Sequence, residues 1–260
     1  MPRRFSFLPG IIAVLLASAA IAGPPFQTDD PETLEQGHWE FYMSAQVLRN
    51  FNGDLSGLGP LFEGNYGLTN DVQLHVIAPF AFQRPRGFPG PFGYGDTELG
   101  TKIRFLHETD DLPQVGIYPL VELPTGEKDD GLSNGQAQVY IPVWIQKSFG
   151  PWTTYGGAGY WFNPGPANRN WWFIGWEVQR KLTESFTLGA EVFHTTANTL
   201  GNSGQSSINL GGIYDISDTY HLMLSVGHSF QGPGQLEGYF GLQITFGPGG
   251  PGDKAAKAVK

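Results

Sequence analysis

The sequence predicts an all-β fold, a transmembrane antiparallel β-barrel of about twelve strands joined as an up-and-down meander. Apolar and polar residues alternate along most of the chain from Trp39 onward, which indicates strands rather than helices. Only 15% of the 260 residues are charged, whereas about a quarter are charged in a typical soluble domain. Much of the exterior is therefore not expected to meet water.

The N-terminus has the composition of a secretory signal. Arg3 and Arg4 precede an apolar run over 11–17, and residues 20–22 read Ala-Ile-Ala, a small-residue cleavage site. The apolar run is too short to span a bilayer comfortably. We therefore expect residues 1–22 to be a cleaved signal peptide, followed by an irregular periplasmic N-terminal arm over 23–38.

The barrel is expected to occupy 39–246. Its predicted strands are 39–49, 60–68, 72–82, 95–107, 113–123, 136–149, 152–162, 171–182, 186–195, 206–215, 220–230 and 236–246. Long Gly- and Pro-rich connections alternate with tight turns such as Gly150-Pro151. This alternation is typical of outer-membrane barrels, whose extracellular loops are long and whose periplasmic turns are short. Residues 247–260 are predicted to be a flexible, solvated C-terminal tail.

The stretch GDTELGTKIRF, 95–105, shows the two faces of a predicted strand. Leu99, Ile103 and Phe105 share one face, and charged residues share the other. A barrel of twelve strands is wider than one that side chains can fill, so an apolar lining would enclose a void. We therefore expect the apolar face to contact lipid and the polar face to line the lumen. Aromatic residues near both strand ends fit the two belts of a membrane interface.

The polar face supplies the candidate functional residues. Acids are expected mainly in the half nearer the long loops, and bases nearer the tight turns. This pattern predicts either an acidic vestibule that admits neutral or cationic solutes, or charges that pair and plug the lumen. The inward aromatic residues either form a stacking track for aromatic solutes or only fill the lumen. The candidates are Asp96, Glu98, Lys102, Arg104, Glu122, Glu63, Glu191, Tyr118, Tyr140 and Trp144.

Other functional classes find little support in the sequence. The net charge of -9 argues against a nucleic-acid partner, and the chain has no Cys for a disulfide or thiolate site. No Ser lies two residues from a His on a shared strand face, so no catalytic residues and no enzyme activity are expected. Glu127, Asp129 and Asp130 lack the spacing of a calcium loop, so we expect no metal site and no cofactor. The oligomeric state is not defined by these patterns.

Several motifs resemble one family of Gram-negative outer-membrane proteins, which is catalogued under the meta-pathway of phenol degradation and often described as transporters. The matching pieces are PPFQTDDPE, GHWEFY, YGLTNDVQLHV, GDTELGTKIRF, IYPLVELPTGE and WTTYGGAGY. The resemblance implies a single outer-membrane barrel in contact with lipid, and passage of small aromatic or hydrophobic compounds. We therefore expect a passive channel or facilitator for small solutes. The alternative is an occluded structural or adhesive barrel whose extracellular loops bind a partner.

Overall fold

The computed structural model describes residues 23–248, 250 and 251. The predicted signal peptide, residues 1–22, and most of the predicted C-terminal tail lie outside the described residues. The arm and all the predicted strands lie within them.

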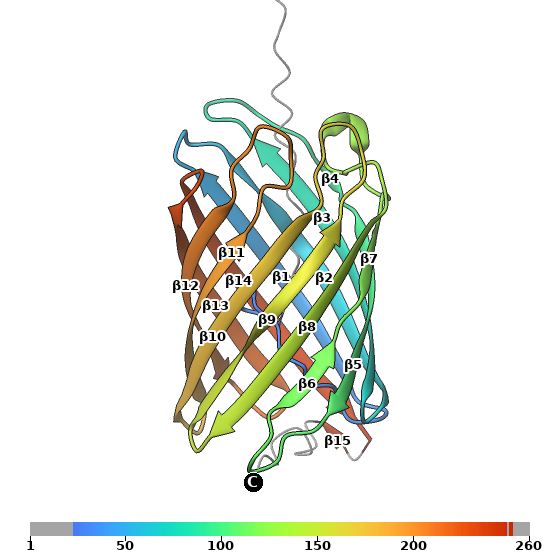
Figure 1. Ribbon diagram of the computed structural model, residues 1–260, viewed down its shortest axis with the longest axis vertical. Helices are drawn as coiled ribbons and strands as arrows, with labels where there is room; N and C mark the ends of the chain where they lie inside the picture. The colour runs from blue at the N-terminus through green and yellow to red at the C-terminus, as the bar shows by residue number, and fades with distance from the viewer. Residues whose placement is uncertain (1–22, 249, 252–260) are drawn as a thin grey trace, which may run out of the picture.

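The described chain is almost entirely strand (Figure 1). One 3-10 turn, Lys128–Asp130, lies in a loop, and no helix of the described part is long and apolar enough to cross a membrane. The strands are β1 (Trp39–Asn50), β2 (Leu55–Thr69), β3 (Val72–Arg84), β4 (Phe92–Tyr94), β5 (Thr97–Leu106), β6 (Gln114–Ile117), β7 (Leu120–Leu123), β8 (Gln138–Phe149), β9 (Trp152–Phe162), β10 (Trp171–Thr183), β11 (Phe186–Thr195), β12 (Gln205–Asp215), β13 (Tyr220–Gln231), β14 (Gln235–Gly247) and β15 (Gly250–Pro251).

The sheet closes on itself, because β14 pairs with β1 along its full length and each strand pairs with its neighbours around the ring. β3 pairs with β5, and β6 and β7 occupy consecutive lengths of one strand position between β5 and β8. Counting β6 and β7 together, and leaving out the short β4 and β15, gives twelve wall strands. The predicted twelve-stranded antiparallel meander is confirmed.

Two strand assignments differ from the prediction. β2 begins at Leu55 rather than at residue 60, because a register shift between Leu58 and Leu61 lets pairing with β3 continue. The predicted strand over 113–123 is interrupted between Ile117 and Leu120, where Pro119 has no amide hydrogen to donate. The Pro119 carbonyl still accepts from the Thr101 amide at 3.0 Å, so the wall stays closed across the interruption.

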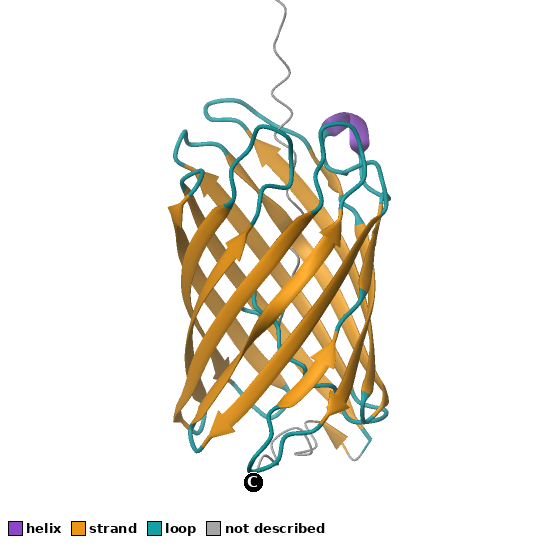
Figure 2. Cartoon of the chain, in the orientation of Figure 1, coloured by secondary structure: helices purple, strands orange, loops and turns teal. Residues whose placement is uncertain are grey.

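The two rims of the barrel differ. Long connections gather at the upper rim in Figure 2, and tight turns at the lower rim. β1 rises from the tight-turn rim and β14 returns to it, as the even number of strands requires. We refer to these as the long-loop rim and the short-turn rim.

The outer face carries the apolar side chains. Along β13, for example, Leu224 and Val226 are exposed while Ser225 and Met223 are buried. Most exposed aromatic residues lie near the strand ends, and smaller apolar residues such as Val143 lie between them; Trp176, near the middle of β10, is an exception. The aromatic residues toward the short-turn rim are Trp39, Phe41, Phe105, Phe149, Tyr214, Tyr220 and Phe246, and those toward the long-loop rim are Phe92, Phe162, Trp172, Phe230 and Phe240.

A closed barrel with an apolar outer band and aromatic belts satisfies its backbone internally and presents lipid-compatible side chains. This construction places the chain in the outer membrane of a Gram-negative bacterium.

The N-terminal arm lies inside the barrel, which corrects the periplasmic position predicted from the sequence. The arm joins the start of β1 at the short-turn rim, where the Gly37 amide donates to the Gly67 carbonyl. Farther along, Thr28 and Asp29 are buried and bond to inward side chains of the wall. A twelve-stranded lumen is too wide for wall side chains alone to fill. The arm occupies part of that space.

Candidate functional site

Two wall strands hold the arm across the lumen. On β5, Lys102 Nζ donates to Asp29 Oδ1 at 2.9 Å and lies 3.6 Å from Asp30 Oδ1. On β11, Glu191 accepts from the backbone amides of Gln27 and Thr28, each at 2.8 Å. These strands lie nearly opposite each other in the ring. The arm is therefore tied to both sides of the lumen.

A buried polar network lies on β2, β3 and β5. His75 Nδ1 is 2.7 Å from Asn65 Oδ1, and His75 Nε2 is 3.1 Å from Glu98 Oε1. Asn65 donates in turn to Glu63 Oε1 at 2.8 Å. Tyr118 meets the His75 ring edge-on, with 5.3 Å between centroids. Glu63, Glu98 and Tyr118, all predicted lumen residues, are thus brought together around a histidine that the prediction did not single out.

Arg104 and Glu122 each bond to a different neighbour. Arg104 donates to the Asn70 carbonyl at 2.7 Å and to Asp71 Oδ1 at 3.3 Å, so it binds the short turn between β2 and β3. Gln138 donates to Glu122 Oε1 at 2.7 Å. Arg104 is thus paired with an acid of a neighbouring turn, and Glu122 accepts from a neutral amide. Ion selectivity of the lumen stays a prediction.

Asp96 has a role in the long-loop region. Its carboxylate accepts from the backbone amides of Gly126 and Asn134, each at 2.9 Å. Asp96 therefore holds two parts of the loop between β7 and β8 together. Its own side chain is half-buried. In the same loop Asp129 and Asp130 are exposed, and no cluster that could hold a metal ion occurs among the described residues.

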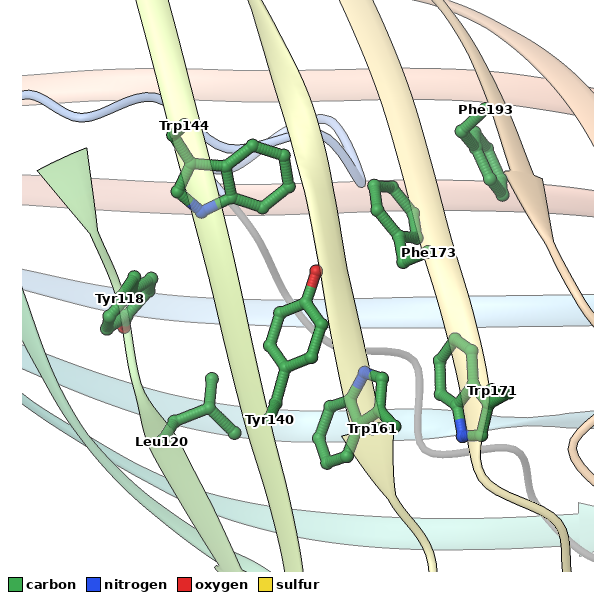
Figure 3. Packing of buried hydrophobic residues seen from close by; sticks show 8 residues of the cluster. All are labelled: Tyr118, Leu120, Tyr140, Trp144, Trp161, Trp171, Phe173 and Phe193. Carbon is green, nitrogen blue, oxygen red and sulfur yellow. The ribbon is translucent and has the colours of Figure 1, made fainter. Parts of the chain in front are cut away.

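An aromatic cluster covers the inner face from the β6–β7 position to β11 (Figure 3). Tyr140 stacks on Trp161 with centroids 4.7 Å apart, and Trp161 stacks on Trp171 at 5.5 Å. Phe173 and Phe193 stack at 5.6 Å, and Trp144 meets Phe173 edge-on at 6.1 Å. We call this set the aromatic cluster; it comprises Tyr118, Leu120, Tyr140, Trp144, Trp161, Trp171, Phe173 and Phe193.

The prediction contained only part of this cluster. Trp161, Trp171 and Phe173 were not among the predicted site residues, although they share the inward parity of their strands. Their signal was the cross-strand register, which places Tyr140 opposite Trp161 and Trp161 opposite Trp171. Register is not fixed by the sequence of any one strand, so this row could not be found from strand periodicity alone.

One Ser–His pair escapes a search along single strands. His194 on β11 and Ser206 on β12 are register partners, with His194 Nδ1 2.8 Å from Ser206 Oγ. The Ser206 hydroxyl donates to Gln231 Oε1 at 3.1 Å, so its proton is directed away from the histidine. Within the described part of the chain, no carboxylate orients the other His194 nitrogen. The pair lacks the arrangement of a serine nucleophile and its base.

Solved structures share this architecture. An outer membrane channel from Pseudomonas putida F1 matches with a TM-score of 0.67 and 16% identity, covering 84% of this chain and 98% of that one. The NanC porin matches at 0.54 and 8% identity, covering 77% and 98%. The translocator domain of the autotransporter NalP from Neisseria meningitidis matches at 0.53 and 10%, covering 82% and 90%. Channels and a translocator match alike, so these similarities show the fold alone.

Sequence comparison identifies the family. A search of curated protein sequences gives no match. A family model described as "Putative MetA-pathway of phenol degradation" matches residues 24–246. That span contains most of the arm and all twelve wall strands. The chain therefore belongs to this family.

Proposed function

We propose that this protein is a passive outer-membrane channel or facilitator for small solutes, with aromatic or hydrophobic compounds as the preferred class. The observation that carries the proposal is the aromatic cluster on the inner face. Lipid-facing aromatic residues are explained by the membrane, whereas stacked Tyr and Trp rings inside a barrel either fill the lumen or bind a solute. The rings are at most 6% exposed, so an aromatic solute would stack on them by displacing the groups that now cover them.

Two further facts support this proposal. The family description refers to phenol degradation, and phenol combines an aromatic ring with one hydroxyl group. Trp144 Nε1 and Trp161 Nε1 are buried and have no hydrogen-bond partner among the described residues. A bound phenolic hydroxyl would supply an acceptor for either indole N–H.

Uptake into proteoliposomes tests the proposal. Purified full-length protein is reconstituted, and entry of an aromatic, a sugar and a nucleoside solute of similar size is measured against protein-free liposomes. The proposal predicts protein-dependent, saturable entry of the aromatic solute, with slower entry of the sugar and the nucleoside. Equal rates for all three solutes would contradict the proposed preference for aromatic compounds. Absence of entry of every solute would contradict the proposed channel function.

A second candidate function is an occluded barrel whose loops bind a partner. It is favoured by the arm, which crosses the lumen and is bonded on both sides. The two candidates differ in one measurement. Conductance after displacement of the arm separates them. A channel conducts once the arm is displaced, whereas a barrel with a purely structural or adhesive role needs no pathway, and its partner binding depends on the loops.

A further inference from the structure

We infer that Glu177 binds the ammonium group of an aromatic amine whose ring lies on the adjoining part of the aromatic cluster. This inference rests on the proposed channel function and narrows its substrate class to compounds with both a ring and a positive charge. It depends on the hydrogen-bond partners of the lumen acids, the position of the bases, and the residues next to Glu177.

Glu177 is a buried acid without a donor. It lies on β10 with none of its surface exposed, and neither carboxylate oxygen has a hydrogen-bond partner among the described residues. Its register partner on β11, Glu191, is also buried but accepts from Gln27, Thr28 and Asn209. A buried carboxylate without a partner is costly unless a donor or cation completes it.

The bases of the lumen are committed elsewhere. Lys102 is bound by Asp29 and Asp30 of the arm, and Arg104 by Asp71 and the Asn70 carbonyl. Within the described residues, neither base forms an ion pair with Glu177. A cation that pairs with Glu177 would therefore come from outside the described residues.

Acceptors also exceed donors along the strands that follow. Register places Glu177, Glu191 and Asn209 in one row across β10, β11 and β12, and the row continues through Gly227 to Glu237 on β14. The Asn209 amide donates to Glu191 and also contacts Glu237, while the Asn209 oxygen and Glu237 Oε1 have no partner among the described residues. Exchanging the Asn209 oxygen and nitrogen would only move the deficit to Glu191. Apart from the Thr28 hydroxyl of the arm, the unpartnered atoms along this row are acceptors, and an ammonium group would supply donors to them.

Two aromatic rings of the cluster lie on the same stretch of the inner wall as this carboxylate. Phe173 precedes Glu177 by four residues on the same face of β10, with only Gly175 between them on that face. On β11, Phe193 follows Glu191 by two residues on the same face. Successive residues of one strand face are about 6.6 Å apart. The stacked Phe173 and Phe193 rings, visible side by side in Figure 3, therefore lie within reach of a ring whose amine contacts Glu177.

The arm already places a ring at this point. A methyl group on Gly189 would lie 2.5 Å from Glu177 Oε1 and 2.7 Å from the Phe26 ring, so carboxylate and ring meet over the same glycine. Phe26 is buried there, and Thr28 of the arm lies over Gly175 beside Phe173. The arm thus occupies the site with an aromatic side chain but brings no cation. An aromatic amine would replace the Phe26 ring and also supply the missing charge.

Calorimetric titration of the full-length protein in detergent tests the inference. The probes are 2-phenylethylamine, the neutral 2-phenylethanol and the ringless ethylamine, at neutral pH where both amines are cations. We expect phenylethylamine to bind at least about tenfold more tightly than either comparison compound, as a charge-assisted hydrogen bond requires. The variant Glu177→Gln should remove this preference while leaving weak binding of phenylethanol unchanged.

Two other variants keep the test decisive. Glu177→Asp retains the carboxylate and should retain the preference for the amine, whereas a purely structural role would make Asp as harmful as Gln. Glu184→Gln removes a fully exposed charge from the short-turn rim and should change nothing. The inference is overturned if the wild type binds the alcohol and the amine equally, binds neither, or keeps its preference in Glu177→Gln. A channel that transports phenol without preferring amines would contradict this inference alone, while absence of all transport would contradict the proposed function.

Discussion

Lys102 on the barrel wall and Asp29 in the N-terminal arm form a buried ion pair, with 2.9 Å between Nζ and Oδ1. The two residues are 73 positions apart in the sequence. This pair makes the arm part of the barrel interior. It also uses the one lysine that is buried among the described residues, so that lysine is not available as a counter-ion for the acids on the facing wall.

The ion pair predicts how the arm can be released. In Lys102→Met, Asp29 would stay buried without its cation, an arrangement that costs about 3–5 kcal/mol. We expect the arm to leave the lumen, with larger single-channel conductance in planar bilayers and faster proteolysis within residues 23–38.

The matched control is Lys181→Met, which removes a lysine paired with exposed Glu184 at the short-turn rim. Conductance and proteolysis should stay at wild-type values in that variant. An unchanged conductance in Lys102→Met would mean that this pair does not hold the arm in the lumen.

The aromatic cluster predicts a substrate effect. Trp161→Leu removes the ring that stacks on both Tyr140 and Trp171, and should weaken binding of a phenolic solute by about 0.5–1.5 kcal/mol. Trp172→Leu alters a neighbouring tryptophan that faces outward and should leave this affinity unchanged. Fluorescence titration with phenol measures both. Equal loss in the two variants would point to a general disturbance of the wall.

The orientation of the strands predicts a dependence on depth. Val226 is 60% exposed near the middle of β13, so Val226→Arg should lower the free energy of unfolding by about 2–4 kcal/mol in lipid vesicles. Ile216 lies in the turn before the same strand, where an arginine should cost at most about 1 kcal/mol. Urea titration in vesicles compares them. Equal costs at the two positions would show that the middle of β13 does not face the hydrocarbon.

Asp96 predicts a local effect on one loop. Asp96→Ala would leave the amides of Gly126 and Asn134 without their shared acceptor, so the loop between β7 and β8 should loosen. Faster protease cleavage within residues 124–137 is the expected result, with thermal stability of the barrel little changed. Asp110→Ala, in an exposed turn at the other rim, serves as the control. Cleavage at the wild-type rate in Asp96→Ala would show that other contacts hold the loop.

The barrel could be predicted because its strands carry local signals. Period-two alternation, as in the segment from Thr97 to Phe105, fixes both the strand and its faces, and alternating connection lengths fix the two rims. The gap at Pro119 and the extension of β2 to Leu55 depend on pairing across strands, which such signals do not determine.

The interior was less predictable for the same reason. The arm has no period-two pattern, so its place depends on partners far away in the sequence, such as Glu191 and Lys102. The polarity of the inward face was visible in the sequence. The sequence did not show which of these acids have partners, because the partners come from other strands. Glu98 bonds to His75, whereas Glu177 has no hydrogen-bond partner among the described residues.

Proteoliposome flux of a small aromatic solute tests directly whether the protein is a channel. Wild-type protein and Lys102→Met are reconstituted at equal density, and phenol entry is compared with entry of a sugar of similar size. If the protein is a channel, phenol entry depends on the protein and is faster in Lys102→Met, where the arm no longer crosses the lumen. Absence of phenol entry from both preparations would contradict the channel and favour an occluded barrel.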